Sequence, residues 1–553
     1  MRWKGWCLAP TEGEVVSEPK SDMVDLPGSL IRTVDEVQDR DHREVLAPLA
    51  GQPAAILGAL GRLGGYADTL QGSARLLRGM RLCSIQADLY RLLAACGETG
   101  ELPACSLDSE EILSLKQKRA LGDLPAAYEA RINQLQRLDL RQNLEAVGAI
   151  APAAAMDRQE YGRQFVVEAP LRLGISSANA SDNHLRTKEQ GGKTLNVGID
   201  LQVEGEMVPA PPLRVVVRRL PAPGLVLRSR STGFEGDLAL GPGEAPVVQR
   251  GSFFAYRHGG DEALRLIKQA LVHVGIVREG NEDIVEQVAA YTGGGGLEIE
   301  THSKVLQGSG LGTSSILAAG MLKVLYRLAG HAIATPAGEY PALYDQSLLL
   351  EQSVGLNSGW QDARGACGGP SAVKDFYAPP TLGLPDPRVQ FIAIDEARFA
   401  GRVVLFNTGI ARLATRGLNV VLGAYLSRDA GRYPAIRESL AIHDQMVAAL
   451  SGGDYALLGQ LASRYWQLRC TLDPDATSPL IRQLFEEPRL RLHCEGGMLT
   501  GAGGGGFALL ICREGQATAL KEELRQLRRV PGYERSGVVE YRLNRTGLRL
   551  SER

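Results

Sequence analysis

The spacing of apolar side chains divides the chain into a helical first part and a mixed second part. Between residues 45 and 145 apolar side chains recur three or four positions apart, as at Ile56 and Leu60, which predicts amphipathic helices. Gly64-Gly65 and the segment 98–103 predict breaks between these helices. No polar cluster in this part indicates chemistry, so we interpret it as a structural or assembly region.

Beyond a predicted linker at 148–155 the pattern changes to short strands mixed with helices. Segments rich in β-branched residues, or alternating in polarity, predict strands at 164–170, 213–219 and 296–301. Helical spacing predicts helices at 262–277, 340–353 and 419–468. The chain closes on a predicted strand, helix and strand at 507–512, 516–527 and 538–543. This mixture indicates an α+β protein.

Composition adds size and excludes several classes of partner. A chain of 553 residues is too long for one core, so two or three packed units are expected. Lys and Arg number 61 against 63 Asp and Glu, which gives no electrostatic reason to expect nucleic acid or a membrane surface as partner. No apolar run of about 18 residues predicts a membrane span. The 8 cysteines form no Cys-x-x-Cys pair, so we expect a cytoplasmic protein without a zinc or redox motif.

The first candidate site is a glycine loop at 308–312 that leads into an apolar helix. Hydroxyl side chains stand at the start of that helix, whose free N–H groups favour a phosphate. The loop lacks the Gly-Lys-Ser/Thr ending of a Walker motif, and Thr313 replaces the third glycine of a dinucleotide motif. A simple glycine turn with a capping serine is the alternative.

A second glycine-rich turn occupies residues 501–506. Its spacing formally matches Gly-x-Gly-x-x-Gly, but an apolar strand follows where a dinucleotide-binding fold needs a helix. Ordering so many glycines costs backbone entropy. We therefore predict a backbone surface that lies against a substrate or its phosphates.

A third motif places two carboxylates, Glu351 and Asp362, around a glycine-containing turn. One could hold Mg²⁺ and the other could accept a proton. Two ordinary surface carboxylates are the alternative.

In this order the three motifs resemble the GHMP kinases, and among them the fucose kinase branch. The resemblance extends over about 164–543; the stretches that carry it are 308–317, 358–362, 408–414 and 501–507. It implies the GHMP kinase fold, with an N-terminal domain similar to the second domain of ribosomal protein S5 and a ferredoxin-like C-terminal domain. We expect a mostly helical region at 1–155, followed by these domains at 156–390 and 391–553.

The resemblance also implies ATP, Mg²⁺ and a set of site residues. Asp362 matches the catalytic carboxylate and Arg172 the basic residue that pairs with it, while Ser314 and Glu351 match the metal ligands. The predicted phosphate-binding residues are Gly308, Ser309, Gly310, Leu311, Gly312, Thr313, Ser314 and Ser315.

The sequence departs from the branch in the loop that faces the sugar. Fucose kinases usually carry Gly-Gly-Trp-Ser-Asp-Thr after the arginine, and only Asp182 and Asn183 align with its end, after a one-residue insertion. His184 is either a sugar contact or a solvated loop residue. The predicted substrate residues are Asp182, Asn183, Gly359, Trp360, Arg412, Gly501, Ala502, Gly503 and Gly504.

The expected function is phosphorylation of the anomeric hydroxyl of L-fucose or a close analogue. A kinase for another sugar, such as a heptose phosphate or another deoxyhexose, and a non-catalytic sugar sensor are the alternatives. The resemblance further implies a kinase without the guanylyltransferase that accompanies many fucose kinases. A homo-oligomer is left open.

Overall fold

The computed structural model describes most of the chain outside the first 30 residues. The described residues are 31, 34, 41–97, 101–146, 162–176, 181–202, 207–231, 234–258, 262–280, 283–306, 308–329, 341–356, 358–410 and 415–553. The predicted linker at 148–155 and the predicted boundary after residue 155 lie outside them.

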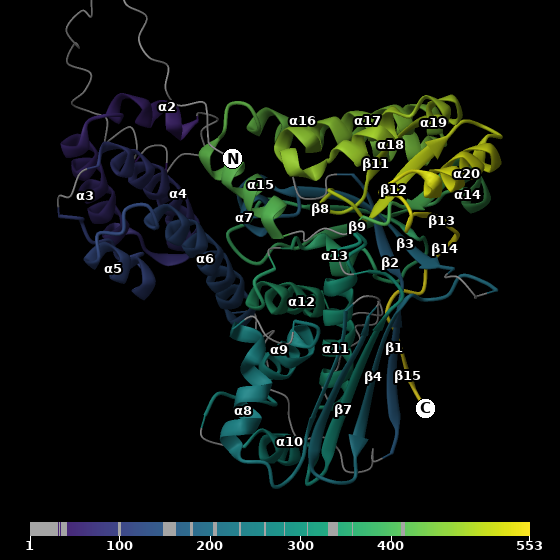
Figure 1. Cartoon of the computed structure of the whole chain (residues 1–553), viewed down its shortest axis with the longest axis horizontal. Coiled ribbons are helices and arrows are strands. Elements are labelled where there is room, and N and C mark those ends of the chain that lie inside the picture. The colour runs from purple at the N-terminus through teal and green to yellow at the C-terminus, as the bar shows by residue number, and fades with distance from the viewer. Residues whose placement is uncertain are drawn as a thin grey trace, which may run out of the picture.

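The helices of the first part gather beside the rest of the molecule (Figure 1). They are α2 (His42–Leu46), η2 (Ala47–Leu49), α3 (Pro53–Thr69), α4 (Gly72–Cys96), α5 (Glu110–Gln117) and α6 (Leu124–Ala146). The break predicted at Gly64-Gly65 is wrong, because α3 runs through it. Gly64 serves close packing instead: a Cβ there would lie 2.6 Å from the carbonyl oxygen of Ala104.

A six-stranded sheet forms the base of the second part, in the order β15-β1-β4-β7-β5-β6. All its neighbours are antiparallel except β5 and β7. Its strands are β1 (Gln164–Ala169), β4 (Leu213–Leu220), β5 (Gly224–Ser231), β6 (Phe234–Leu240), β7 (Gly296–Ser303) and β15 (Arg549–Glu552). The chain leaves this sheet at Pro170, which has no N–H for a ladder, and enters β2 (Leu171–Ser176).

Two further sheets complete the strands. One has the order β14-β3-β8-β9, formed by Tyr541–Leu543, Gly192–Leu201, Val373–Ala378 and Arg388–Ile392, and β2 also pairs with β3. The other has the order β11-β12-β10-β13, formed by Cys494–Leu499, Phe507–Cys512, Val403–Asn407 and Gly537–Val539. The single strand predicted at 538–543 is therefore two strands in different sheets.

Helix α11 (Thr313–Leu328) lies directly on the six-stranded sheet (Figure 1). A Cβ at Gly320 would contact Val215 at 3.2 Å and Val167 at 3.4 Å, so the glycine brings the helix close to β4 and β1. Around α11 lie α8 (Pro246–Phe254), η4 (Ala255–His258), α9 (Arg265–His273), α10 (Ile284–Thr292) and α12 (Pro341–Ser353). The helix predicted at 262–277 is shorter at both ends than expected.

The remaining helices cover the third sheet and the site. The stretch 419–468, predicted as helical, contains all of α16 (Tyr433–Gly452) and parts of α15 (Thr415–Ser427) and α17 (Tyr455–Leu472). The others are α7 (His184–Gln190), α13 (Gln361–Arg364), α14 (Glu396–Arg402), η5 (Pro474–Ala476), α18 (Pro479–Glu486), α19 (Pro488–His493), α20 (Ala517–Gln526) and η6 (Leu527–Arg529). Among the described residues no helix is long and apolar enough to cross a membrane.

Candidate active site

The first glycine loop is built from left-handed glycines and opens the N-terminus of α11. Gly308, Gly310 and Gly312 have φ values of 79°, 77° and 75°, a backbone region that favours glycine. Gly312 caps α11 and has no side chain that could accept a hydrogen bond from the first turn of the helix. The first N–H groups of this 16-residue helix therefore remain available to an anion.

The second glycine turn packs backbone to backbone against the first. A Cβ at Gly501 would lie 2.1 Å from the Cα of Gly310, and one at Gly506 would lie 2.4 Å from the carbonyl oxygen of Ser309. Side chains at these positions would push the loops apart. These two glycines thus let loops almost 200 residues apart in sequence meet, a reason that the sequence did not reveal.

The middle of the second turn contacts a short helical turn of the C-terminal part. Gly504 donates its N–H to the carbonyl oxygen of Ala476 in η5, and a Cβ at Gly503 would lie 2.9 Å from that oxygen. Ala502 is half-buried beside them. The roles of Ala502, Gly503 and Gly504 toward a substrate stay a prediction.

Arg172 connects the phosphate loop to Asp362. Its Nη1 donates to the carbonyl oxygen of Gly310 at 3.0 Å, while its Nε and Nη2 donate to Asp362 Oδ1, the former at 2.9 Å. Arg172 is on β2 and Asp362 on α13, so the fold joins residues that are 190 positions apart. The arginine is buried, whereas the Asp362 side chain keeps 18% of its surface exposed. A reactant can therefore reach the carboxylate.

Asp182 lies buried beside this pair. Its carbonyl oxygen accepts a hydrogen bond from the Trp360 backbone N–H at 3.1 Å, and a Cβ at Gly359 would overlap its carboxyl group. Burial, followed by the nearby charge of Asp362, raises the pKa of Asp182 to about 6. Gly359 is thus needed to make room for this carboxyl.

Glu351 forms a second buried carboxyl, surrounded by hydroxyl groups. Its Oε2 accepts hydrogen bonds from Ser315 and, at 2.6 Å, from Ser358. Burial raises the pKa of Glu351 to about 7, against the opposing effect of these hydroxyls. The resemblance implied Ser314 and Glu351 as metal ligands; Ser314 also hydrogen-bonds this carboxyl, next to Ser315 and Ser358. The contact of Ser358 with Glu351 was not predicted, and only the position of Ser358, just before Gly359, could have suggested it.

The segment after Asp182 is a helix and not an open loop. Asn183 caps α7, its side chain accepting the N–H of Arg186 at 3.3 Å. His184 is buried and pairs with Asp139 at 2.9 Å, so the solvated alternative for His184 is wrong. The prediction of amphipathic helices in the first part did not single out Asp139, because one carboxylate in a helix recognised by its apolar spacing gives little signal.

Of the other predicted substrate residues, Trp360 is buried and Arg412 is not described. The indole of Trp360 is buried, and its N–H donates to Thr187 Oγ1 at 2.8 Å. Arg412 and residues 177–180 of the sugar-facing loop lie outside the described residues. Their roles remain predictions.

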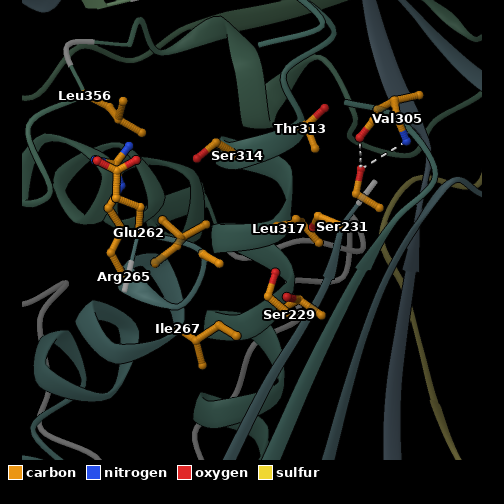
Figure 2. Close-up of a pocket in the computed structure, with 14 residues that line it drawn as sticks. Ser229, Ser231, Glu262, Arg265, Ile267, Val305, Thr313, Ser314, Leu317 and Leu356 are labelled. Carbon is orange, nitrogen blue, oxygen red and sulfur yellow. Dashed lines mark hydrogen bonds between the residues drawn. The ribbon is translucent and has the colours of Figure 1, made fainter. Parts of the chain in front are cut away.

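A pocket opens beside the start of α11 that the sequence did not predict (Figure 2). Hydroxyl groups contribute to its lining, from Ser229 on β5 and from Thr313 and Ser314 on α11 (Figure 2). Leu317 and Ile267 supply an apolar surface. The enclosed cavity itself is small, about 50 Å³.

Hard oxygen donors around Glu351 suit Mg²⁺, but they do not form a complete metal cage. Within the described ranges no cluster of three or more His, Cys, Asp or Glu could hold a metal ion. Mg²⁺ commonly binds through one or two carboxylates together with substrate phosphates and water. The donor set therefore fits an ion that arrives with a phosphate ligand.

Two family models match the chain in sequence order. The GHMP kinases N-terminal domain matches residues 277–369, and the GHMP kinases C-terminal domain matches residues 446–528. The first match contains the phosphate loop, Glu351 and Asp362, and the second contains the 501–506 turn. The chain therefore has both halves of the GHMP kinase fold, while Arg172 and Asp182 lie outside the matched segments.

Curated relatives cover a longer stretch of the chain. It is 29% identical over 372 residues to the bifunctional fucokinase/GDP-fucose pyrophosphorylase of Arabidopsis thaliana, a match over 67% of this chain and 32% of that protein. It is 26% identical over 361 residues to the L-fucokinase/L-fucose-1-P guanylyltransferase of Bacteroides fragilis, covering 65% of this chain and 35% of that protein. The chain thus spans about a third of the length of these relatives.

Solved structures resemble the chain more distantly. Lactococcus lactis galactokinase complexed with galactose is 14% identical, with a TM-score of 0.47 over 71% of this chain and 95% of that chain. Methanococcus jannaschii mevalonate kinase is 14% identical, with a TM-score of 0.45 over 68% of this chain and 98% of that chain. At these similarities neither structure indicates a substrate.

Proposed function

We propose that this chain, which belongs to the GHMP kinase superfamily, transfers the terminal phosphate of ATP to a sugar hydroxyl. The observation that carries the proposal is the position of Arg172, which joins the carbonyl of Gly310 in the glycine loop to the carboxylate of Asp362. A phosphate site and a proton acceptor linked by one buried guanidinium suit an in-line transfer, which depends on positioning and charge neutralisation.

In this proposal Asp362 accepts the proton of the attacking hydroxyl. The sugar oxygen forms a bond to the terminal phosphorus, the bond from that phosphorus to the leaving ADP oxygen breaks, and the hydroxyl proton passes to Asp362. Arg172 holds the carboxylate in place through two donors on one oxygen. The N–H groups at the start of α11 and the glycine loop hold the phosphates.

For the base of the nucleotide we propose the side of that helix on which the pocket lies. Thr313 and Ser314 belong both to the pocket wall and to the first turn of α11. A ligand that fills the pocket can therefore place its phosphates at the helix N-terminus. The hydroxyls of β5 and the apolar side chains of Leu317 and Ile267 suit a planar, partly polar ring.

Glu351, with Ser314 and Ser315 beside it, would hold Mg²⁺ together with the phosphates. The ion neutralises phosphate charge when it is bound. Near neutral pH the raised pKa of Glu351 leaves part of the carboxyl protonated in the metal-free protein. A nearby cation favours the ionised form.

For the acceptor we propose L-fucose or a close analogue, phosphorylated at the anomeric hydroxyl. The names of the two curated relatives support this choice, and Asp182 supplies a buried carboxyl next to Asp362 that can bind sugar hydroxyls. A site built around such a group rejects analogues that lack the matching hydroxyl.

The test combines a sugar panel with one substitution. ADP release is measured with L-fucose, other deoxyhexoses, hexoses and heptose phosphates, first with the wild-type protein and then with Asp362→Asn. We expect one sugar class to be turned over, and we expect Asp362→Asn to lower kcat by about 10²- to 10⁴-fold with ATP affinity within a few-fold. Sugar binding without turnover in the wild type would indicate a sensor, and a variant with more than about a tenth of wild-type activity would refute the role of Asp362.

A further inference from the structure

Helix α7 connects the candidate acceptor site to the N-terminal helices. It begins two residues after Asp182 and lies between the site and helices α4 and α6 (Figure 1). Four of the seven residues of α7 carry ionisable side chains.

On the side of the N-terminal helices, α7 is fixed by buried ion pairs. Asp139 of α6 accepts hydrogen bonds from His184 Nε2 at 2.9 Å and from Lys188 Nζ at 2.6 Å, and all three side chains are at most 2% exposed. Burial opposes ionisation of Asp139, but its two partners lower its pKa below the ordinary value. Arg81 of α4 adds a third bond, to Glu189 Oε2 at 2.8 Å.

On the side of the site, α7 holds the backbone next to Asp182. Thr187 Oγ1 and Arg186 Nη1 donate to the carbonyl oxygen of Ser181 at 3.2 Å and 3.3 Å. Thr187 Oγ1 also accepts the indole N–H of Trp360, whose backbone N–H donates to the carbonyl oxygen of Asp182. A shift of α7 would therefore move Ser181 and Asp182.

The same helix α6 also reaches the segment that carries Glu351. Arg137 Nη1 donates to the carbonyl oxygen of Gln352 at 3.5 Å, one residue after Glu351. Helix α6 thus contacts α7, which follows Asp182 in the chain, and α12, which carries Glu351.

We propose that the N-terminal helices are part of the acceptor site, with Asp139 as a positioning residue that fixes α7 and thereby Asp182. The inference rests on the proposed function for its kinetic consequence. Removing one partner of a buried charge cluster leaves the others uncompensated, so α7 loosens when Asp139 loses its charge. Small displacements of positioning groups cost large factors in transfer reactions.

The test compares Asp139→Asn with a matched variant, Asp108→Asn. Asp108 also forms a buried ion pair, with Lys116 Nζ at 2.6 Å, and accepts a hydrogen bond from Tyr128, but both partners lie within the N-terminal helical part. We expect Asp139→Asn to raise the KM for the sugar by about 10-fold or more while the KM for ATP stays within about two-fold. Asp108→Asn should leave both constants close to wild type.

Hydrogen–deuterium exchange gives a readout that needs no turnover. In Asp139→Asn we expect faster exchange over residues 181–193 and unchanged exchange over 308–328, whereas Asp108→Asn changes neither. Absence of turnover in the wild-type protein would refute the proposed function and leave the exchange test of α7 in force. If Asp139→Asn does not fold, the double variant Asp139→Asn/Lys188→Met is tested in place of the single variant. It also removes the lysine that loses its partner. Equal exchange and equal sugar KM in the Asp139 and Asp108 variants would overturn the inference.

Discussion

Asp182 and Asp362 place like charges near each other in a part of the site where Asp182 is almost closed to water. Arg172 neutralises one of them through direct hydrogen bonds to Asp362. The ionised form of Asp182 stays unfavourable. Burial, followed by the charge of Asp362, raises the pKa of Asp182 to about 6 from an ordinary 3.8. This difference ties the stability of the fold to pH.

We predict that Asp182 destabilises the protein as pH rises from about 4 to about 6. In this window the unfolded chain carries an ionised Asp182 while the native carboxyl keeps its proton, so the native state binds one proton more and stability falls as pH rises. The loss relative to Asp182→Asn is on the order of 2–3 kcal/mol. Urea unfolding of both proteins at pH 4, 5, 6 and 7 measures it.

The neighbouring carboxylate supplies a control for this prediction. Replacing Asp362 by Asn removes the like charge, so the pH window of Asp182 should move to lower pH in Asp362→Asn. A stability difference between wild type and Asp182→Asn that stays constant from pH 4 to pH 7 would contradict the assignment.

At the scale of elements, the two glycine turns form one unit, although they belong to opposite parts of the chain. Gly501 has φ = 62° and no room for a Cβ next to Gly310, whereas Gly515 has a similar φ of 72° and open space around it. Comparing Gly501 with Gly515 therefore distinguishes the effect of backbone strain from the effect of loop packing. Replacing either glycine introduces backbone strain, but only a side chain at position 501 would push the phosphate loop away.

We therefore predict different outcomes for two alanine substitutions. Gly515→Ala should lower the free energy of unfolding by about 1 kcal/mol and leave ATP binding unchanged. Gly501→Ala should in addition weaken ATP binding by about 10-fold or more, because it displaces Gly310. Calorimetric titration with ATP and Mg²⁺, next to urea unfolding, measures both. Equal ATP affinity in the two variants would show that the turns do not act together.

The motifs explain how far the sequence could lead at this scale. The glycine loop before α11 could be predicted from local spacing, whereas the catalytic role of Asp362 is implied by the resemblance to the GHMP kinases and stays a prediction. The approach of Gly501 to Gly310 could not be predicted, since it depends on how distant elements pack. The buried contact between His184 and Asp139 could not be predicted either, because it also depends on how distant elements pack. Asp139 lies on a helix that was predicted from its apolar positions.

Over the whole molecule, the end of the chain returns to the sheet where the mixed part begins. Strand β15 pairs with β1, with Phe165 opposite Glu552 and Glu168 opposite Arg549. Strand β14 likewise joins β3. These returns cross the predicted boundary at residues 390 and 391, and no local signal in the sequence predicts long-range pairing of this kind. Since β1 continues through Pro170 into β2, the last strand also supports the element that carries Arg172.

We predict that deleting residues 548–553 loosens β1 and, through β2, the active site. The deletion removes the β15 ladder and the bond from Gln164 N–H to the carbonyl oxygen of Arg553, so hydrogen exchange over 164–169 should rise by about 10-fold or more. Turnover should fall several-fold, because Arg172 loses part of its support. As a control, Arg549→Ala removes only the exposed ion pair to Glu168 and should change neither quantity. Unchanged exchange over 164–169 in the truncated protein would show that β1 is held by β4 alone, and that the C-terminal strand does not couple the two ends of the mixed part.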